Sequence, residues 1–276
     1  MSTALRFGGR QVLYHYASTE AAISIIRSRT LRATSIHHMN DAREFKHALD
    51  VVRNQLRILR DQQQPTDAPF FEAFEERLTG IQGINIHAFC LSEHDDQLSQ
   101  WRAYCRGGGY ALGFDAERLA RLMEQNGFQL ARCIYAPEEQ GAKARDSLQG
   151  ALSVFRQSVG RGEGVQKAIE TARGGFFPGF VLTGPFFKHP AFREEAEWRL
   201  VAFQHDPDDP RLDFRSAPDF IVPYLGCQLE ELPLVNVVVG PTPEPELAMM
   251  TMGRMLRRFG VKYQQISRST VPYRGL

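Results

Sequence analysis

The sequence predicts an α+β fold, and two observations lead to this class. Runs with apolar residues at spacings of three and four, typical of amphipathic helices, are concentrated in the first part of the chain. Runs rich in β-branched and aromatic residues dominate the last third. The two kinds of run do not alternate as in a doubly wound parallel sheet. With no internal repeat and no low-complexity linker, we expect one domain over residues 1–276, with a helical insertion around 137–180.

The first half of the chain contains four strand-like runs, at 12–16, 30–35, 84–92 and 110–114. A small polar residue, Ser18 or Thr19, is expected to cap a helix that follows the first run. Three further helices are expected in this half, over 45–59, from 70 until Gly80, and from Asp115 to Gly127.

The second half is expected to contain a helical region over 138–173, interrupted by "GRGEG", and a helix over 245–260. Its strand-like runs lie at 130–136, 197–203, 219–225, 235–241 and in the closing "VKYQQIS". These runs complete the α+β prediction.

The composition limits the possible classes of function. Hydrophobic residues make up 43% of the 276, with 19 Phe, which suffices for a packed core. A formal charge of +1 gives no general attraction to nucleic acid or to a membrane. No signal-like start and no long apolar run is present, so we expect a cytoplasmic protein, although an injected effector would have the same features. The four scattered cysteines argue against a zinc ribbon and a disulfide framework: Cys90, Cys105, Cys133 and Cys227.

Three polar motifs have ordinary structural explanations. "SEHDD" (92–96) is expected to be a loop that caps the following helix, because adjacent triad residue types say little about a triad. "RGGGYALG" (106–113) lacks the lysine of a phosphate-binding loop and predicts a tight turn, with close approach to a ligand as the alternative. "NDAREF" (40–45) resembles a capping box. The adjacent His37 and His38 diverge on any regular element, and we expect no metal site.

The segment "EEAEWRLV" (194–201) is the most informative. On a strand, Glu195, Glu197 and Arg199 would share one face, about 7 Å apart in succession at ~3.3 Å per residue. A solvated strand face is one explanation. The other is a site for oxocarbenium chemistry, in which one carboxylate holds a ribose hydroxyl and the second directs a nucleophile.

The segment "VLYHYAS" (12–18) places a histidine between two tyrosines. On a strand, Tyr14 and Tyr16 project to the face opposite His15. Either the tyrosines pack inward and His15 faces a cleft, or the reverse holds, and the local sequence leaves both possibilities open.

Eight ordered blocks resemble a bacterial family known as domain of unknown function 2971. They are "LYHYAS", "LRATS", "NDAREF", "FCLSEHDDQLSQWRAY", "GGYALGFD", "FK" with "FREEAEWRL", "VVVGP" and "SRSTVPYR", between about residues 12 and 274. Ala17 and Ala42 depart from the pattern, where Thr and Pro are usual. The family in turn resembles the ADP-ribosyltransferase superfamily of the type with a His, an aromatic residue and a Glu on three strands.

That second resemblance implies a split, strongly bent sheet and NAD as the substrate. His15 would bind a ribose of NAD, Tyr104 or Tyr110 would stack on the nicotinamide, and Glu197 would stabilise the sugar cation. Glu195 would position the acceptor. The remaining residues implied at the cofactor are Tyr16, Ser18, Arg32, Ser35, Trp101 and Arg199, with Ser18, Arg32 and Ser35 along the diphosphate and Trp101 supporting the floor.

The resemblance therefore implies transfer of ADP-ribose from NAD to a macromolecule, protein or nucleic acid, or hydrolysis of NAD. A toxin, an effector or a defence component would use such an activity. The alternative is an inactive relative that binds a nucleotide or a protein partner. Neither possibility calls for a metal, because the leaving nicotinamide is already a cationic pyridinium before the bond breaks.

Overall fold

The computed structural model describes residues 6–7, 10–39, 44–62, 64–79, 85–105, 107–204, 206, 208–217 and 219–272. The chain forms two compact units. Unit 1 comprises Met1–Ser35, Ile86–Arg132 and Glu194–Leu276, and unit 2 comprises Ile36–Asn85 and Cys133–Arg193. Each unit is described by itself.

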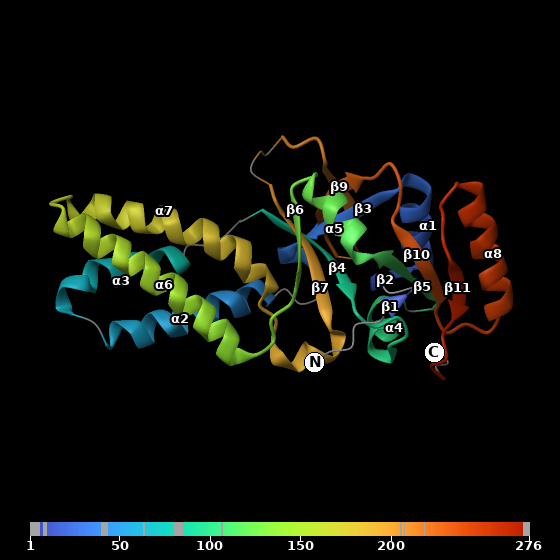
Figure 1. Cartoon of the computed structure of the whole chain (residues 1–276), viewed down its shortest axis with the longest axis horizontal. Helices are drawn as coiled ribbons and strands as arrows, with labels where there is room; N and C mark the ends of the chain where they lie inside the picture. Colours follow the sequence, from blue (N-terminus) through green and yellow to red (C-terminus); the bar gives the residue numbers. More distant parts are fainter. Residues whose placement is uncertain are drawn as a thin grey trace. The chain divides into compact units, whose positions relative to one another are not determined.

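Unit 1 is built on a sheet of eleven strands within the described residues, in the order β11-β10-β5-β2-β4-β3-β9-β8, with β1, β6 and β7 off this path. Figure 1 labels most of these strands. Their bounds are β1 Arg6–Phe7, β2 Arg10–Ser18, β3 Thr30–Ser35, β4 Ile86–Ser92, β5 Gly109–Asp115, β6 Phe128–Arg132, β7 Glu197–Phe203, β8 Leu212–Ser216, β9 Ile221–Gln228, β10 Leu234–Val239 and β11 Gln265–Arg268.

Two hydrophobic clusters cover the two faces of this sheet. On one face, α1 (Thr19–Ser28), α5 (Ala116–Glu124) and α8 (Pro245–Arg258) bury apolar side chains against Leu13 and Ala17 of β2. On the other face, Trp101 of α4 (Leu98–Tyr104) packs with Tyr14 and Tyr16. The alternation along β2 is the one that the sequence predicts, with the two tyrosines packed inward.

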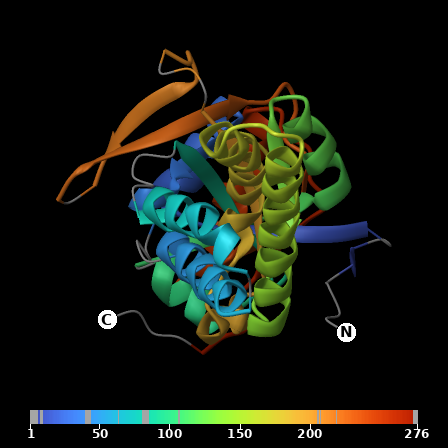
Figure 2. The ribbon, with the colours of Figure 1, turned by 90° about the vertical axis from the view of Figure 1, so that its left-hand side faces the viewer.

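The described residues of unit 2 include four α-helices, α2 (Glu44–Arg60), α3 (Ala68–Thr79), α6 (Pro137–Gly160) and α7 (Val165–Thr183). Helix α2 packs on α3 and α6, and α7 packs on α3 and α6, so the four close into a bundle that Figure 2 shows close to end-on. The centre of the bundle is aromatic: Phe70, Phe74, Phe155, Phe176 and Phe180. Short 3-10 helices precede or follow these elements: η1 Ile36–His38, η2 Pro65–Asp67, η3 Gly184–Phe186 and η4 Pro190–Glu195.

The α+β class is confirmed, and most predicted elements are present. The helical region over 138–173 is divided into α6 and α7 at "GRGEG", as expected. The strand expected at 130–136 instead spans Phe128–Arg132, because residues 128–132 pair with β7. Strand β8 was not predicted, because four of its five residues are exposed and it lacks a buried face. The single domain with its insertion remains a prediction beside the two compact units.

Candidate functional site

A pocket in unit 1 lies where strand β2 departs from strand β4. It contains about 320 Å³ of space free of atoms, part of which is open solvent. Residues from β2, β4, α4 and the segment that enters β7 line it: Tyr14, His15, Tyr16, Cys90, Leu91, Gln100, Tyr104, Glu195 and Glu197.

The pocket exists because β4 changes partners along one edge. Strand β7 pairs with β4 over its whole length, from Ile86 to Ser92. On the other edge, β3 pairs with residues 87 and 88, and β2 pairs only at Ser92, opposite Tyr14. Within the described part of the chain, residues 89–91 have no strand partner on this edge. The sheet is therefore split at the point where the resemblance places the site.

His15 occupies the split. Its Nδ1 lies 2.8 Å from the carbonyl oxygen of Cys90, and its ring stacks on Phe89 with centroids 4.1 Å apart. A carbonyl can only accept, so Nδ1 carries the proton and Nε2 of the neutral ring is left as an acceptor. Burial lowers the pKa of His15 from 6.5 to about 4, opposed in part by the bond to Cys90. The imidazole is therefore neutral at pH 7.

Glu197 and Arg199 form a buried ion pair at the start of β7. Glu197 lies opposite Ser92, and Arg199 lies opposite Cys90, two positions further along. Arg199 Nε donates to Glu197 Oε1 at 2.7 Å, and Nη2 donates to Oε2 at 3.3 Å. Both residues are buried, and Arg199 is 0% exposed. Two parallel hydrogen bonds fix the orientation of the carboxylate that borders the pocket.

The prediction that Glu195 shares a strand face with Glu197 and Arg199 is wrong. Glu195 ends the 3-10 helix η4, and Ala196 has φ 42°, a left-handed conformation that interrupts the extended chain before β7. Ser92 Oγ donates to the carbonyl oxygen of Glu195 at 2.7 Å and holds this turn in place. Glu195 still lines the pocket together with Glu197.

Aromatic residues form one wall of the site. The Tyr16 hydroxyl donates to the carbonyl of His94 at 2.9 Å, and burial raises the pKa of Tyr16. The Trp101 ring meets Tyr16 edge-on at 4.6 Å, and its Nε1 donates to Asp96 at 2.7 Å. Trp101 is buried behind Tyr16, so it supports the pocket without lining it. Tyr104, which is 37% exposed, is at the mouth.

Six residues implied by the resemblance do not line this pocket, two of them being Trp101, which lies behind Tyr16, and Arg199, which pairs with Glu197. Ser18 caps α1 through a bond from the Ala21 amide, as the sequence predicts. Arg32 lies over the ring of Tyr224, 5.1 Å from its centroid, and Ser35 is buried at the end of β3. Tyr110 packs on the main core, so of the two tyrosines only Tyr104 reaches the pocket. The roles of Ser18, Arg32 and Ser35 along a diphosphate remain predictions.

Sequence reasoning missed Tyr14, Cys90, Leu91 and Gln100 as pocket residues. Gln100 had a usable signal, because it is four positions before Tyr104 and lies on the same face of a helix. Cys90 and Leu91 had none, because they line the pocket only where two strands separate. For Tyr14, the alternation along β2 leaves open whether the tyrosines or His15 face a cleft, and in the structure both line the pocket.

The three polar motifs behave mostly as ordinary structure. Gly107 and Gly108 have φ of 78° and 116° and form the expected turn into β5. The predicted cap of α4 is wrong in detail: the N-cap is Gln97, whose side chain makes no capping bond, and Asp96 binds the Trp101 indole instead. The capping box proposed for "NDAREF" lies outside the described residues at 40–43.

The described residues hold no group of three or more His, Cys, Asp or Glu arranged to bind a metal ion. They also include no helix with the length and apolar character needed to cross a membrane.

The fold and the pocket define a class of protein: an α+β chain with a split sheet and a pocket bordered by an imidazole and a buried carboxylate. Comparison with known families adds one match. Residues 100–200 match the family described as "Protein of unknown function (DUF2971)", a stretch that includes most of α4 and also Glu195, Glu197 and Arg199. No curated protein and no solved structure matches the chain.

Proposed function

We propose that this chain cleaves the glycosidic bond of NAD and transfers ADP-ribose to a macromolecule, or to water. The observation that carries the proposal is that His15, from the second strand, and Glu197, nearly two hundred positions later, border one pocket in a split sheet. The order of the sequence blocks that carry the resemblance, with His before the aromatic residue and Glu, supports the same assignment. The match over residues 100–200 is to a family of unknown function, so the finer assignment to an ADP-ribosyltransferase rests on the resemblance and on the pocket.

The pocket supplies the groups that this reaction needs. As the C1′–N bond of NAD breaks, its electron pair leaves with neutral nicotinamide and positive charge develops on the ribose. Glu197 places a negative charge beside that ribose, and the neutral His15 offers Nε2 to a ribose hydroxyl. Tyr104, at the mouth, stacks on the nicotinamide. The reaction then closes when a nucleophile bonds to C1′ and its proton passes to the Glu195 carboxylate.

The residues that border the pocket indicate how NAD would bind. His15, Tyr104 and Glu197 are the residues implied at the nicotinamide and its ribose, so the nicotinamide riboside end would enter the pocket. The remainder would extend past Ser18 and Arg32, two of the residues implied along the diphosphate. Ser35, the third, is buried.

Nicotinamide release tests the proposal. Purified protein is incubated with NAD, with and without a cell lysate, and nicotinamide is measured by chromatography. Glu197→Gln keeps one acceptor oxygen for Arg199, replaces the other with an NH2 donor and removes the charge, so we expect nicotinamide release to fall on the order of 10²–10³-fold. Glu194→Gln, an exposed neighbour two positions before the turn residue Ala196, serves as the matched control with unchanged release.

Equal silence of the wild type and Glu197→Gln with both NAD and lysate would rule out the activity. If NAD then raises the melting temperature without release of nicotinamide, the chain is the inactive nucleotide-binding relative. If it does not, the pocket binds another molecule.

A further inference from the structure

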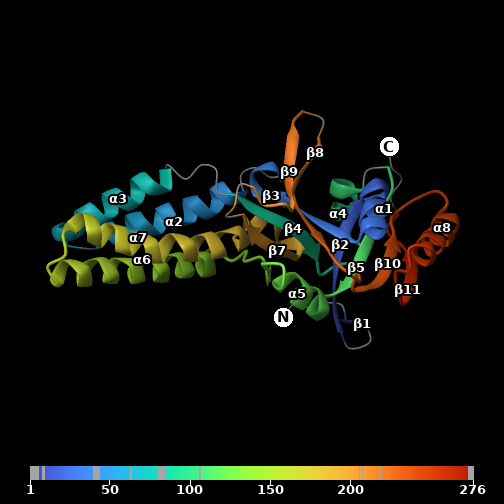
Figure 3. The ribbon, with the colours of Figure 1, turned by 90° about the horizontal axis from the view of Figure 1, so that it is seen from above.

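The hairpin formed by β8 and β9 ends the sheet of unit 1. Strand β9 pairs with β3 on its inner side and with β8 on its outer side. Strand β8 is the last in the order, so among the described residues its outer edge has no strand partner. Figure 3 shows the hairpin projecting away from the other strands of the unit. Exposed edges of this kind present unpaired backbone N–H and C=O groups.

The hairpin also exposes large apolar side chains. Phe214 is 58% exposed, Phe220 is 53% exposed and Ile221 is 69% exposed. Ile221 pairs with Ser216, two positions from Phe214, so Phe214 and Ile221 lie on the same face as diagonal neighbours. An edge strand is normally protected by charge or by cover. Here the edge carries apolar groups that a partner would bury.

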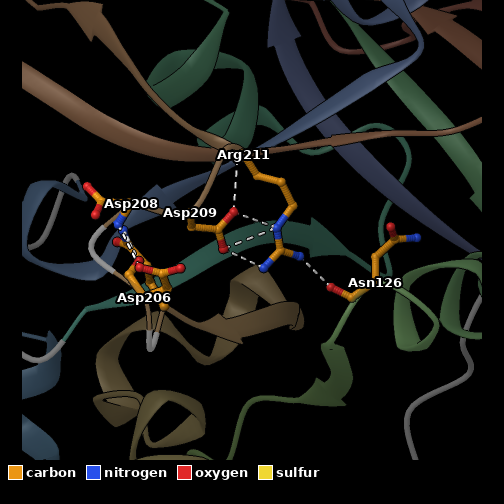
Figure 4. Close-up of polar contacts among 6 residues, drawn as sticks. Asn126, Asp206, Asp208, Asp209 and Arg211 are labelled. Atoms are coloured by element: carbon orange, nitrogen blue, oxygen red, sulfur yellow. Dashed lines mark hydrogen bonds and ion pairs between the residues drawn. The ribbon is translucent and has the colours of Figure 1, made fainter.

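The surroundings of the hairpin are acidic. Residues 206–219 include five aspartates and two arginines, whereas the whole chain has a formal charge of +1. Arg211 is neutralised by Asp209 at 2.7 Å, and its Nη1 donates to the carbonyl of Asn126, as Figure 4 shows. Asp206 and Asp208, at the base, are exposed, and so is Asp219 at the tip. Arg215 is the positively charged residue within β8 itself.

We propose that the outer edge of β8 binds an extended, basic segment of a protein, which adds a further strand to the sheet. Backbone hydrogen bonds to β8 would supply affinity, Phe214 and Ile221 would contact alternate apolar side chains, and the aspartates at both ends would attract lysine or arginine. The local negative charge disfavours nucleic acid. The inference rests on the proposed function in one respect: this segment belongs to the macromolecule that accepts ADP-ribose.

Peptide binding tests the surface without any reference to catalysis. The probes are dye-labelled ten-residue peptides measured by fluorescence anisotropy: alternating arginine and valine, alternating glutamate and valine, and the basic peptide with proline at every second valine. We expect the basic peptide to bind at least tenfold more tightly than the other two, because the second lacks charge complementarity and the third lacks backbone donors. Equal binding of the three peptides would overturn the proposal.

Variants locate the binding site. Phe214→Ser with Ile221→Ser should weaken binding of the basic peptide at least tenfold, and because both side chains are exposed the protein should fold normally. Leu247→Ser with Met250→Ser, at exposed apolar positions on α8, should leave binding unchanged. If both pairs weaken binding equally, or neither does, the edge of β8 is not the site. A wild-type dimer that the hairpin variant dissociates would assign the edge to a second copy of the chain.

Labelled NAD in a lysate separates this proposal from the previous one. If both hold, the hairpin variant releases nicotinamide at the wild-type rate in buffer, where water is the acceptor, but transfers label to lysate proteins at least tenfold less. If neither the wild type nor the hairpin variant releases nicotinamide while the basic peptide still binds the edge of β8, the proposed function is wrong and the docking surface is supported. If label transfer is unchanged in the hairpin variant, the acceptor docks elsewhere.

Discussion

Strands β5 and β4 pair with β2 over very different lengths. Strand β5 pairs with β2 residue for residue, from Val12 opposite Asp115 to Ser18 opposite Gly109. Strand β4 pairs with β2 only at Tyr14 and Ser92, and beyond this point a side chain, His15, takes the place of a backbone partner for Cys90. On the β5 side apolar packing is continuous, whereas on the β4 side a pocket opens.

This difference separates stability from chemistry within one strand. A complete ladder of hydrogen bonds satisfies the backbone groups along the edge of a strand, but it leaves no room for a ligand between the two strands. An interrupted ladder leaves room, and the exposed backbone acceptor must be satisfied by something else. His15 satisfies it, and the same bond fixes the tautomer that leaves Nε2 as an acceptor. Three predictions follow from the contrast, in order of decreasing effect.

The largest effect is expected at the buried ion pair of Glu197 and Arg199 on β7, whose carboxylate borders the pocket. Arg199→Met leaves the Glu197 carboxylate buried without its cation, so we expect the free energy of unfolding to fall by ~3–5 kcal/mol in urea titrations. The control is Arg121→Met, whose partner Glu117 is exposed at 3.7 Å, with a change of less than about 0.5 kcal/mol. Equal stabilities of the two variants would show that the pair does not organise this side of the sheet.

A smaller loss is expected on the β5 side, where the ladder is tight. A methyl group at Gly113 would overlap Oδ1 of Asn236 and would lie 2.7 Å from Cε1 of Tyr14. Gly113→Ala should therefore destabilise the protein by ~1–3 kcal/mol through overpacking. Gly150→Ala, in the middle of α6 with open space around it, should be neutral or stabilising. A thermal melt of both variants decides, and a neutral Gly113→Ala would mean that β2 and β5 can separate at little cost.

The smallest effect at neutral pH is expected from His15, which contributes a dependence of stability on pH below 6.5. The folded-state pKa of about 4 is below the ordinary 6.5, so between these values the unfolded chain binds a proton that the folded chain does not. His15 therefore lowers stability as the pH falls from 6.5 toward 4, by at most about 1.4 kcal/mol per pH unit. In His15→Gln, urea titrations at pH 7 and pH 5 should show a smaller loss than in the wild type. An identical loss in both proteins would contradict a buried, neutral imidazole.

The sequence predicted the regular parts of the molecule because periodicity and capping are local. The helix after Ser18 and the alternation of Tyr14, His15 and Tyr16 depend only on neighbours in the chain, and the structure contains them. The position of Glu195 could not be predicted in this way. Ala196 takes a left-handed conformation because the chain must turn from η4 into β7, and alanine gives no local signal for it.

Non-local pairing explains the other differences. The pocket depends on where β2 leaves β4, and on that edge β4 pairs with β3 at residues 87 and 88 and with β2 only at Ser92. Cys90 and Leu91 therefore line the pocket although no local sequence pattern predicts it. Strand β8 was missed because an exposed edge strand lacks the alternating burial that identifies a strand.

A crystal structure of the protein soaked with NAD tests the central claim most directly. The account predicts the nicotinamide ribose in the pocket at the split, with one hydroxyl within hydrogen-bond distance of Glu197 and another within reach of His15 Nε2, and with the pyridine ring against Tyr104. NAD bound at another surface, or a ribose that contacts neither His15 nor Glu197, would contradict it.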